Sequence, residues 1–245
     1  MARTYDSNGN FEYDKYVYPF KTARVITVEE YALGYTAPDY LAGKPSPLDN
    51  QQPAPDQPST WAASSVNSTI KADLVPAYLQ SAYTQTTTRA EFCALAVNLY
   101  ETTFDTAISG RATFTDTKDV NVEKMAYIGV VNGVGDGKFA PNSPLTREQA
   151  ATILARLASI MGYPLPYQAP YFADNSLIST WATDAVGQMQ ASGIMGGVGD
   201  NRFSPKTPYT REQSITTILR LYDSIELYYQ ISGIDRVKVI TPASV

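Results

Sequence analysis

The sequence contains no histidine and a single cysteine, Cys93, in 245 residues. Without histidine there can be no Ser-His or Cys-His nucleophile pair, and the commonest protein metal ligand is missing. A disulfide within the chain is also excluded. Because Cys93 lies among Phe92, Leu95 and Ala96, we expect a buried core thiol and not a nucleophile. These absences predict a protein without a metal site, a cofactor or a catalytic centre.

Long apolar runs and positive charge are scarce as well. No run approaches the ~20 apolar residues that a membrane-spanning helix needs, and the first residues lack the apolar core of a signal peptide. The net charge of −5 and the isoelectric point near 4.8 argue against nucleic acid, which requires a basic face. Any recognition of an anion must therefore be local. The 44% of apolar residues is enough to build a core.

One helical motif occurs three times. Each copy has a Thr, then an Arg, and a Glu or Gln three residues after the Thr, and this spacing predicts a capping box at the start of a helix. The three pairs are Thr88 with Glu91, Thr146 with Gln149, and Thr210 with Gln213. In the middle copy the apolar residues at i, i+3 and i+4 predict one buried face, followed by a stop at Gly162. That face contains Ile153, Leu154, Leu157, Ile160 and Met161.

The first residue of each of these helices is an arginine: Arg89, Arg147 and Arg211. A cation at a helix N-terminus opposes the helix dipole, which costs roughly 0.3–1 kcal/mol. Two explanations are open at this stage. The arginine could pair with a carboxylate of its own or a neighbouring repeat, or it could form a seat for an anionic ligand together with the free N–H groups of the helix start.

Two further segments recur in the second and third units. F-x-D occurs at Phe114 and Phe172, and the glycine-rich stretches NGVGDGKF and GGVGDNRF follow a helical segment in each unit. The glycine-rich stretches and the capped helices repeat at the same offset of 64 positions, and such self-similarity is the signature of a repeat architecture. Neither stretch fits a phosphate-binding loop, which needs G-x-x-x-x-G-K-S/T after a strand. Glycines here permit a close backbone approach to a ligand or simply a tight connection between helices.

The combination of F-x-D, a helix, a glycine-rich loop and T-R-E-Q resembles the S-layer homology domain, and the resemblance covers residues ~60 to ~228. It implies a mainly α fold of three helix-loop-helix repeats in a pseudo-threefold bundle. It also implies non-catalytic binding of a bacterial secondary cell wall polymer, often through a terminal pyruvylated amino sugar, in grooves between repeats. The residues that match the family motifs are Arg89, Arg147, Arg211, Asp116, Asp174, Gly133, Gly135, Asp136, Gly197, Gly199 and Asp200. The first unit departs from the pattern, because it lacks the glycine loop and has Asp73 where the family commonly has glycine.

Two tryptophans stand at equivalent places. Trp61 and Trp181 begin the first helices of the first and third units. A tryptophan can form a flat face for a sugar ring or anchor a core, and we keep both interpretations.

Acidic residues in the first turn of the capped helices, Glu91, Glu148 and Glu212, invite comparison with a glycosidase. Such an enzyme needs two carboxylates facing each other across a sugar, roughly 5–10 Å apart. The helix dipole explains acidic residues in a first turn more simply. We therefore expect no enzymatic activity.

The expected organisation has six parts. They are a tyrosine-rich arm (1–41), a proline-rich linker (42–59), a divergent first repeat (60–106), the second (112–166) and third (170–229) repeats, and a tail (230–245) with a strand-like VKVI. In this scheme the protein attaches to the cell wall at the cell surface. The alternatives are an assembly subunit, such as a virion protein whose arm docks on other subunits, and a fragment of a larger surface enzyme. Replacing Arg147 or Arg211 with Ala is expected to weaken wall binding and leave the fold nearly unchanged, or even slightly stabilised.

Overall fold

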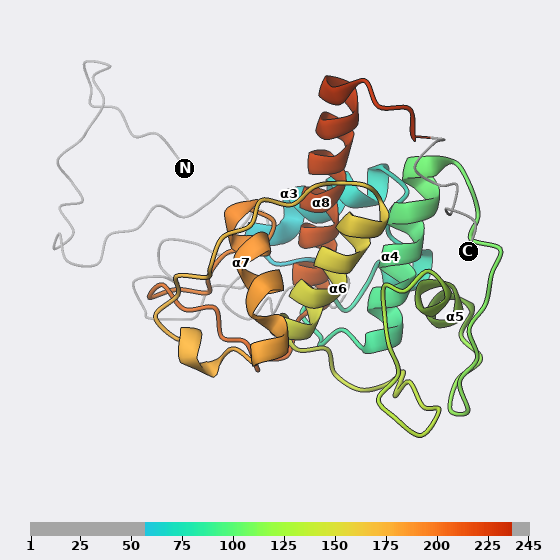
Figure 1. Ribbon diagram of the computed structural model, residues 1–245, viewed down its shortest axis with the longest axis horizontal. Coiled ribbons are helices and arrows are strands. Elements are labelled where there is room, and N and C mark those ends of the chain that lie inside the picture. Colours follow the sequence, from blue (N-terminus) through green and yellow to red (C-terminus); the bar gives the residue numbers. More distant parts are fainter. Residues whose placement is uncertain (1–56, 237–245) are drawn as a thin grey trace, which may run out of the picture. The chain divides into compact units, whose positions relative to one another are not determined.

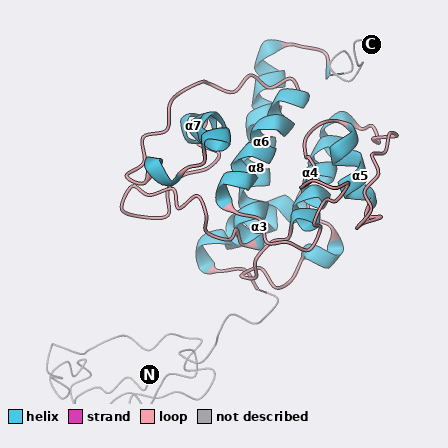
Figure 2. Cartoon of the chain, turned by 60° about the horizontal axis from the view of Figure 1, so that its bottom comes forward, coloured by secondary structure: helices cyan, strands magenta, loops and turns pink. Residues whose placement is uncertain are grey.

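The computed structural model describes residues 57–236, which lie in the second of two compact units, Pro53–Val245. The predicted arm, most of the linker and the VKVI segment fall outside the described residues. Within them the chain forms helices and loops, and the only β-type pairings are isolated bridges (Figure 2). The α-helices are α3 (Thr60–Lys71), α4 (Arg89–Phe104), α5 (Val120–Tyr127), α6 (Arg147–Ile160), α7 (Thr183–Ala191) and α8 (Arg211–Ser232). Short 3-10 helices are η1 (Ala77–Leu79), η2 (Asn175–Leu177) and η3 (Thr180–Ala182). The predicted mainly α fold is confirmed.

All three predicted capping boxes are present. The hydroxyls of Thr88, Thr146 and Thr210 accept from the backbone N–H at N3, and the side-chain oxygen of the N3 residue accepts from the backbone N–H of the Thr. These caps define where α4, α6 and α8 begin. Gly162 follows α6 with φ 68°, in agreement with the predicted stop.

The three capped helices start from a closed ring of backbone hydrogen bonds. The Thr87 N–H donates to the Tyr209 carbonyl (2.8 Å), the Tyr209 N–H to the Leu145 carbonyl (2.8 Å), and the Leu145 N–H to the Thr87 carbonyl (3.0 Å). Each of these residues comes just before the N-cap of its own helix. The same contact thus occurs three times around a pseudo-threefold axis, as the fold class predicted.

The first helices of the three repeats form a second ring, made of packing contacts between helices. Each first helix of a repeat packs on the capped helix of the preceding repeat, so that α5 lies on α4, α7 lies on α6, and α3 closes the circle on α8. In Figure 1, α5 and α7 lie on opposite sides of the three long helices, and α8 contacts both α4 and α6. No repeat therefore buries its apolar face by itself.

The core lies between these helices and is aliphatic and aromatic. Phe92, Leu99, Leu154 and Leu221 are fully buried, and each such side chain contributes about 1.5–3 kcal/mol by leaving water. Cys93 is buried among them as predicted, and burial raises the pKa of its thiol. One expectation for α6 was wrong: Ile160, in the last turn of the helix, is partly exposed.

The first helix of each repeat ends in the same way. The second residue after α5 and α7 is Gly129 or Gly193, both with left-handed φ (81° and 71°), and the corresponding residue after α3 is Asp73 with φ 59°. Left-handed backbone favours glycine and tolerates aspartate less well. The departure of the first repeat at Asp73 therefore preserves the conformation at some cost in backbone strain.

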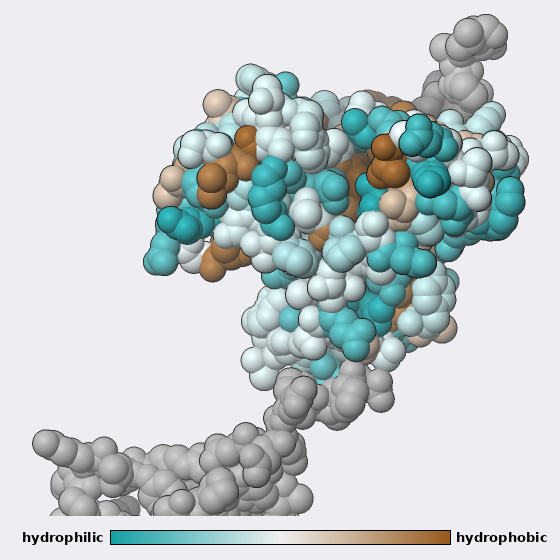
Figure 3. Space-filling model, turned by 90° about the horizontal axis from the view of Figure 1, so that it is seen from below, coloured by the Kyte–Doolittle hydropathy of each residue, from teal (hydrophilic) through white to brown (hydrophobic). Residues whose placement is uncertain are grey.

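The surface offers no broad apolar face in the view from below. Figure 3 shows a mostly hydrophilic surface on this side, with small and separate hydrophobic patches. Within residues 57–236, no helix is both long and apolar enough to cross a membrane, and no three metal-binding side chains gather in one place.

Candidate functional site

Two cavities of about 510 and 280 Å³ lie between the repeats. We call the larger one the α8 groove and the smaller one the α6 groove. The α8 groove is lined by Trp61, Arg147, Met195, Gly196, Gly197, Val198, Tyr209, Gln213, Thr216, Thr217 and Arg220. The α6 groove is lined by Arg89, Val131, Asn132, Gly133, Val134, Gln149, Thr152, Ile153, Arg156 and Trp181. Most of the lining residues correspond at the repeat offset, so the two grooves are the same site built twice.

Every repeat contributes to each groove. In the α8 groove, the second repeat supplies Arg147, the third supplies the glycine loop and the face of α8, and the first supplies Trp61. In the α6 groove, Arg89 comes from the first repeat and Trp181 from the third. An isolated repeat could not form this site.

The arginine is held against the loop of the next repeat. The Arg147 Nε–H donates to the Phe203 carbonyl (2.7 Å) and Nη2 donates to the Gly196 carbonyl (2.7 Å). The guanidinium carbon lies 4.9 Å from the centre of the Phe203 ring and 5.5 Å from that of Tyr209. These contacts fix the plane of the guanidinium at the wall of the groove.

Arg89 repeats this arrangement in the α6 groove. It donates to the Phe139 carbonyl (3.0 Å) and the Asn132 carbonyl (2.9 Å), and it lies 4.3 Å from the Phe139 ring centre. The partners of both arginines are neutral carbonyls and rings. Within residues 57–236, neither Arg89 nor Arg147 forms an ion pair, and their Nη1 atoms have no protein partner.

Burial makes this lack of a counter-ion significant. Arg147 is only 5% exposed, and burial lowers its pKa, an effect that Tyr209 and Asp174 oppose only in part. Burial likewise lowers the pKa of Arg89. A buried charge that is not paired favours a ligand of opposite charge. Both grooves therefore present a preorganised cation with a free donor.

The backbone amides of the helix start do not take part, and in this respect the prediction of a seat made by Arg and free N–H groups was wrong. The Arg147 N–H donates to the Thr207 carbonyl (3.1 Å) and the Glu148 N–H to the Pro205 carbonyl (3.0 Å). The starts of α4 and α8 are satisfied in the same way by the neighbouring repeat. Any anion would have to bind the arginine side chain.

The third interface lies between the start of α8 and the first repeat, and it differs from the other two. Arg211 is paired with Glu91 (2.7 Å) and donates to the Ser81 carbonyl, so here the ion-pair explanation holds. Asn98 stands on α4 where the other capped helices carry Arg156 and Arg220, and the glycine loop is absent. Arg211 is the one predicted arginine whose charge the protein itself neutralises among the described residues.

The F-x-D aspartates hold the loops. The two oxygens of Asp174 accept from the Phe203 and Ser204 N–H groups (both 2.8 Å), and those of Asp116 accept from Phe139 and Ala140 (both 2.8 Å). For Asp174, burial alone would raise the pKa, but these hydrogen bonds outweigh it and the pKa is lowered. Neither aspartate lines a groove.

The predicted glycines divide into two groups. Gly133 and Gly197 line the grooves, and a Cβ at either position would lie 2.6 or 2.8 Å from a carbonyl oxygen across the loop. The remaining predicted loop residues lie outside both cavities: Gly135, Asp136, Gly199 and Asp200.

The tryptophans are surface residues. Trp61 and Trp181 are 57% and 58% exposed, and each forms one wall of a groove. Of the two interpretations kept for these tryptophans, the exposure of both side chains argues against a core anchor. An exposed indole beside an arginine leaves its ring available to a sugar.

Sequence reasoning missed the helix face opposite the tryptophan. Gln149, Thr152, Ile153 and Arg156 of α6 lie at i, i+3, i+4 and i+7, and α8 carries the equivalent face. The signal was present in the sequence, because Arg156 and Arg220 repeat at the same 64-residue offset as the capping Thr.

The comparisons with known proteins agree with this geometry. Residues 113–151 and 172–213 match the S-layer homology domain. An endoglucanase of Bacillus sp. (strain KSM-635) is 40% identical over 95 residues, which are 38% of this chain and 10% of that protein. An amylopullulanase of Thermoanaerobacterium thermosulfurigenes is 30% identical over 178 residues, 69% of this chain and 9% of that protein. The surface-layer 125 kDa protein of Lysinibacillus sphaericus is 25% identical over 196 residues, 75% of this chain and 16% of that protein.

The chain thus spans only a small part of each of these relatives. What they share with it is the repeat region, whose capped helices, F-x-D aspartates and glycine loops have just been described. The chain is therefore a member of the S-layer homology domain family.

Proposed function

We propose that this domain binds an acidic group of a bacterial secondary cell wall polymer without catalysis and so attaches the protein to the cell surface. The observation that carries the proposal is the pair of equivalent grooves in which Arg89 and Arg147 lack a counter-ion from the part of the chain that the structure describes. Repeats of this family typically bind cell wall polymers for surface anchoring.

The chemistry of the grooves suits an acidic sugar. The carboxylate of a pyruvate ketal, or a phosphate, would accept from the free Nη1 of Arg147 and neutralise its charge. The sugar ring would lie against Trp61, while Gln213 and Arg220 offer further donors. Cavities of this size fall near the range of ordinary small-molecule sites.

Several relatives carry enzyme names, but the matched segment is a minor part of each. We propose that the described domain has no catalytic activity. Its first-turn carboxylates Glu148 and Glu212 are bound to serines of the neighbouring repeat, and they do not face each other across a groove.

Co-sedimentation with Gram-positive sacculi tests the proposal. The full chain should sediment with intact sacculi and lose this binding when the secondary polymer has been extracted with acid. Arg156→Ala with Arg220→Ala should reduce binding, because both side chains are exposed in the grooves and contribute little to the core. Lys71→Ala with Lys118→Ala removes the same two positive charges from exposed positions outside the grooves and serves as the control.

Absence of binding to intact sacculi of the source organism or its host would contradict the proposal. That result would favour the alternative of an assembly subunit. Equal binding by the double variant and by the control would contradict the assignment of the grooves.

A further inference from the structure

We propose that Glu148 and Glu212 are positioning residues that hold Trp181 and Trp61 over the two grooves. Each glutamate fastens the helix that carries the tryptophan to the capped helix beneath it. We call this contact the glutamate latch, and its relevance to ligand binding rests on the function proposed above.

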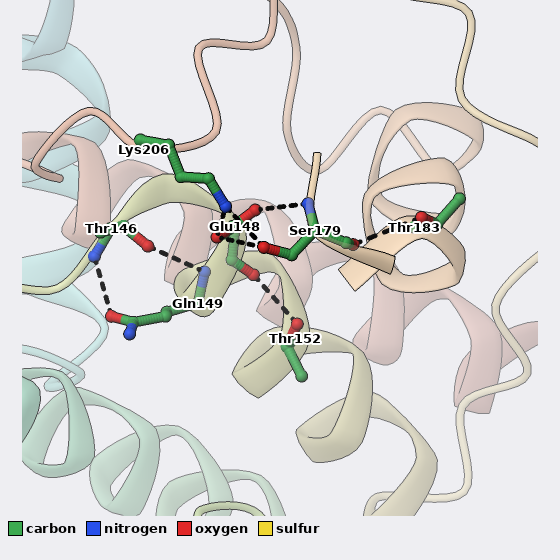
Figure 4. A network of polar contacts seen from close by, with 7 residues as sticks. All are labelled: Thr146, Glu148, Gln149, Thr152, Ser179, Thr183 and Lys206. Atoms are coloured by element: carbon green, nitrogen blue, oxygen red, sulfur yellow. Dashed lines mark hydrogen bonds and ion pairs between the residues drawn. The ribbon is translucent and has the colours of Figure 1, made fainter. Parts of the chain in front are cut away.

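The first latch joins α6 to the start of η3. Glu148 is 3% exposed, and its two oxygens accept from the Ser179 N–H (3.0 Å) and the Ser179 hydroxyl (3.1 Å). The Lys206 ammonium lies 2.5 Å from the same carboxylate (Figure 4). Ser179 is the N-cap of η3, two residues before Trp181. The carboxylate therefore holds the backbone immediately before the tryptophan.

The second latch joins α8 to the start of α3. Glu212 is 4% exposed, and it accepts from the Ser59 N–H (2.9 Å) and the Ser59 hydroxyl (3.0 Å). Ser59 is the N-cap of α3, two residues before Trp61. The same two hydrogen bonds thus occur in both places, although the second pair joins residues 153 positions apart.

The third interface supplies an internal comparison. Ala90 occupies the place of Glu148 and Glu212 on α4, and Asp119 occupies the place of the serine and caps α5 by itself. Asn121 stands where the other repeats have tryptophan. The latch and the tryptophan are therefore absent together, at the interface whose arginine is already paired with Glu91.

A latch is needed because packing does not fix these tryptophans. Each indole is more than half exposed, so its place depends on where its helix begins. A binding site tolerates displacements of only about 0.5 Å in its contact groups. A carboxylate that accepts from both the N–H and the hydroxyl of the N-cap serine restrains the position and the orientation of that serine.

The test uses variants with one tryptophan. Trp181→Phe leaves Trp61 as the only indole, and Trp61→Phe leaves Trp181. In each background, Glu148→Ala and Glu212→Ala are compared by fluorescence anisotropy and by acrylamide quenching. Glu212→Ala should lower the anisotropy and raise the quenching constant of Trp61 and leave Trp181 unchanged, whereas Glu148→Ala should do the reverse.

Two milder changes keep the test informative if the alanine variants fold poorly. Ser59→Ala and Ser179→Ala remove only the hydroxyl, and each should change its own tryptophan in the same direction by a smaller amount. Glu212→Gln can still accept from the Ser59 N–H and donate to the Ser59 hydroxyl, so it should restore the native signal of Trp61.

The crossed design separates positioning from stability. Equal changes in both tryptophans, or no change in either, would overturn the proposal, because a latch acts only on its own helix. The readout requires no wall polymer. If each glutamate variant changes the fluorescence of its own tryptophan but the chain does not bind sacculi, the proposed function is contradicted and the glutamate latch is still supported.

Discussion

Arg147→Ala should destabilise the domain, although the helix dipole alone predicts the opposite. Removing a cation from N1 would relieve a clash of roughly 0.3–1 kcal/mol. In the structure, however, the guanidinium ties α6 to the Phe203 and Gly196 carbonyls and lies against two rings. A hydrogen bond to a charged group contributes about 1.5–3 kcal/mol, and the ring contacts add about 0.5–2 kcal/mol.

The Gly196 carbonyl lines the α8 groove and would be open to water without the arginine, so only the hydrogen bond to the Phe203 carbonyl is counted. The expected net loss is about 1–5 kcal/mol in the free energy of unfolding. Urea denaturation followed by circular dichroism would measure it, with Arg156→Ala as a control for loss of an exposed arginine. Unchanged or increased stability of Arg147→Ala would refute the reasoning, since it would mean that the bonds between repeats contribute nothing beyond the dipole effect.

Three further predictions concern single positions near the grooves. Thr216→Val should raise the free energy of unfolding by about 1 kcal/mol, because the Thr216 hydroxyl is buried and has no hydrogen-bond partner among the described residues; no change in the urea midpoint would contradict this. Gly197→Ala should lower the melting temperature, since its Cβ would lie 2.8 Å from a carbonyl oxygen, whereas Gly196→Ala meets nothing within 4 Å and should melt like the native protein. The lowered pKa of Asp174 means that its contribution to stability is complete above about pH 4 and is lost as the pH falls through the lower folded value. Asp174→Asn should thus be less stable than the native protein at pH 7, and the difference should shrink in urea titrations toward pH 3.

The local signals in the sequence were reliable. Capping boxes predicted the starts of α4, α6 and α8 because a Thr and its N3 partner act within four residues. The buried state of Cys93 followed from its neighbours in the same way. Features that depend on short stretches of chain could therefore be predicted.

Contacts between repeats could not be predicted by the same reasoning. Nothing in the sequence around Trp61 shows that it faces the groove of α8, more than 150 positions away along the chain. The helix-start amides looked free because their acceptors belong to the neighbouring repeat. Both aspartates of F-x-D looked like ligand contacts, yet their oxygens are occupied by loop amides that come about 23–30 positions later.

The closed ring of repeats determines how the domain would respond to the deletion of one repeat. An open solenoid can lose a terminal repeat and expose one new surface. Here α3 packs on α8, so the first and last repeats are neighbours, and removal of any repeat would expose two surfaces at once. Folding should accordingly be all-or-none, and this ring of repeats cannot close during synthesis until α8, the last of the helices within residues 57–236, has been made.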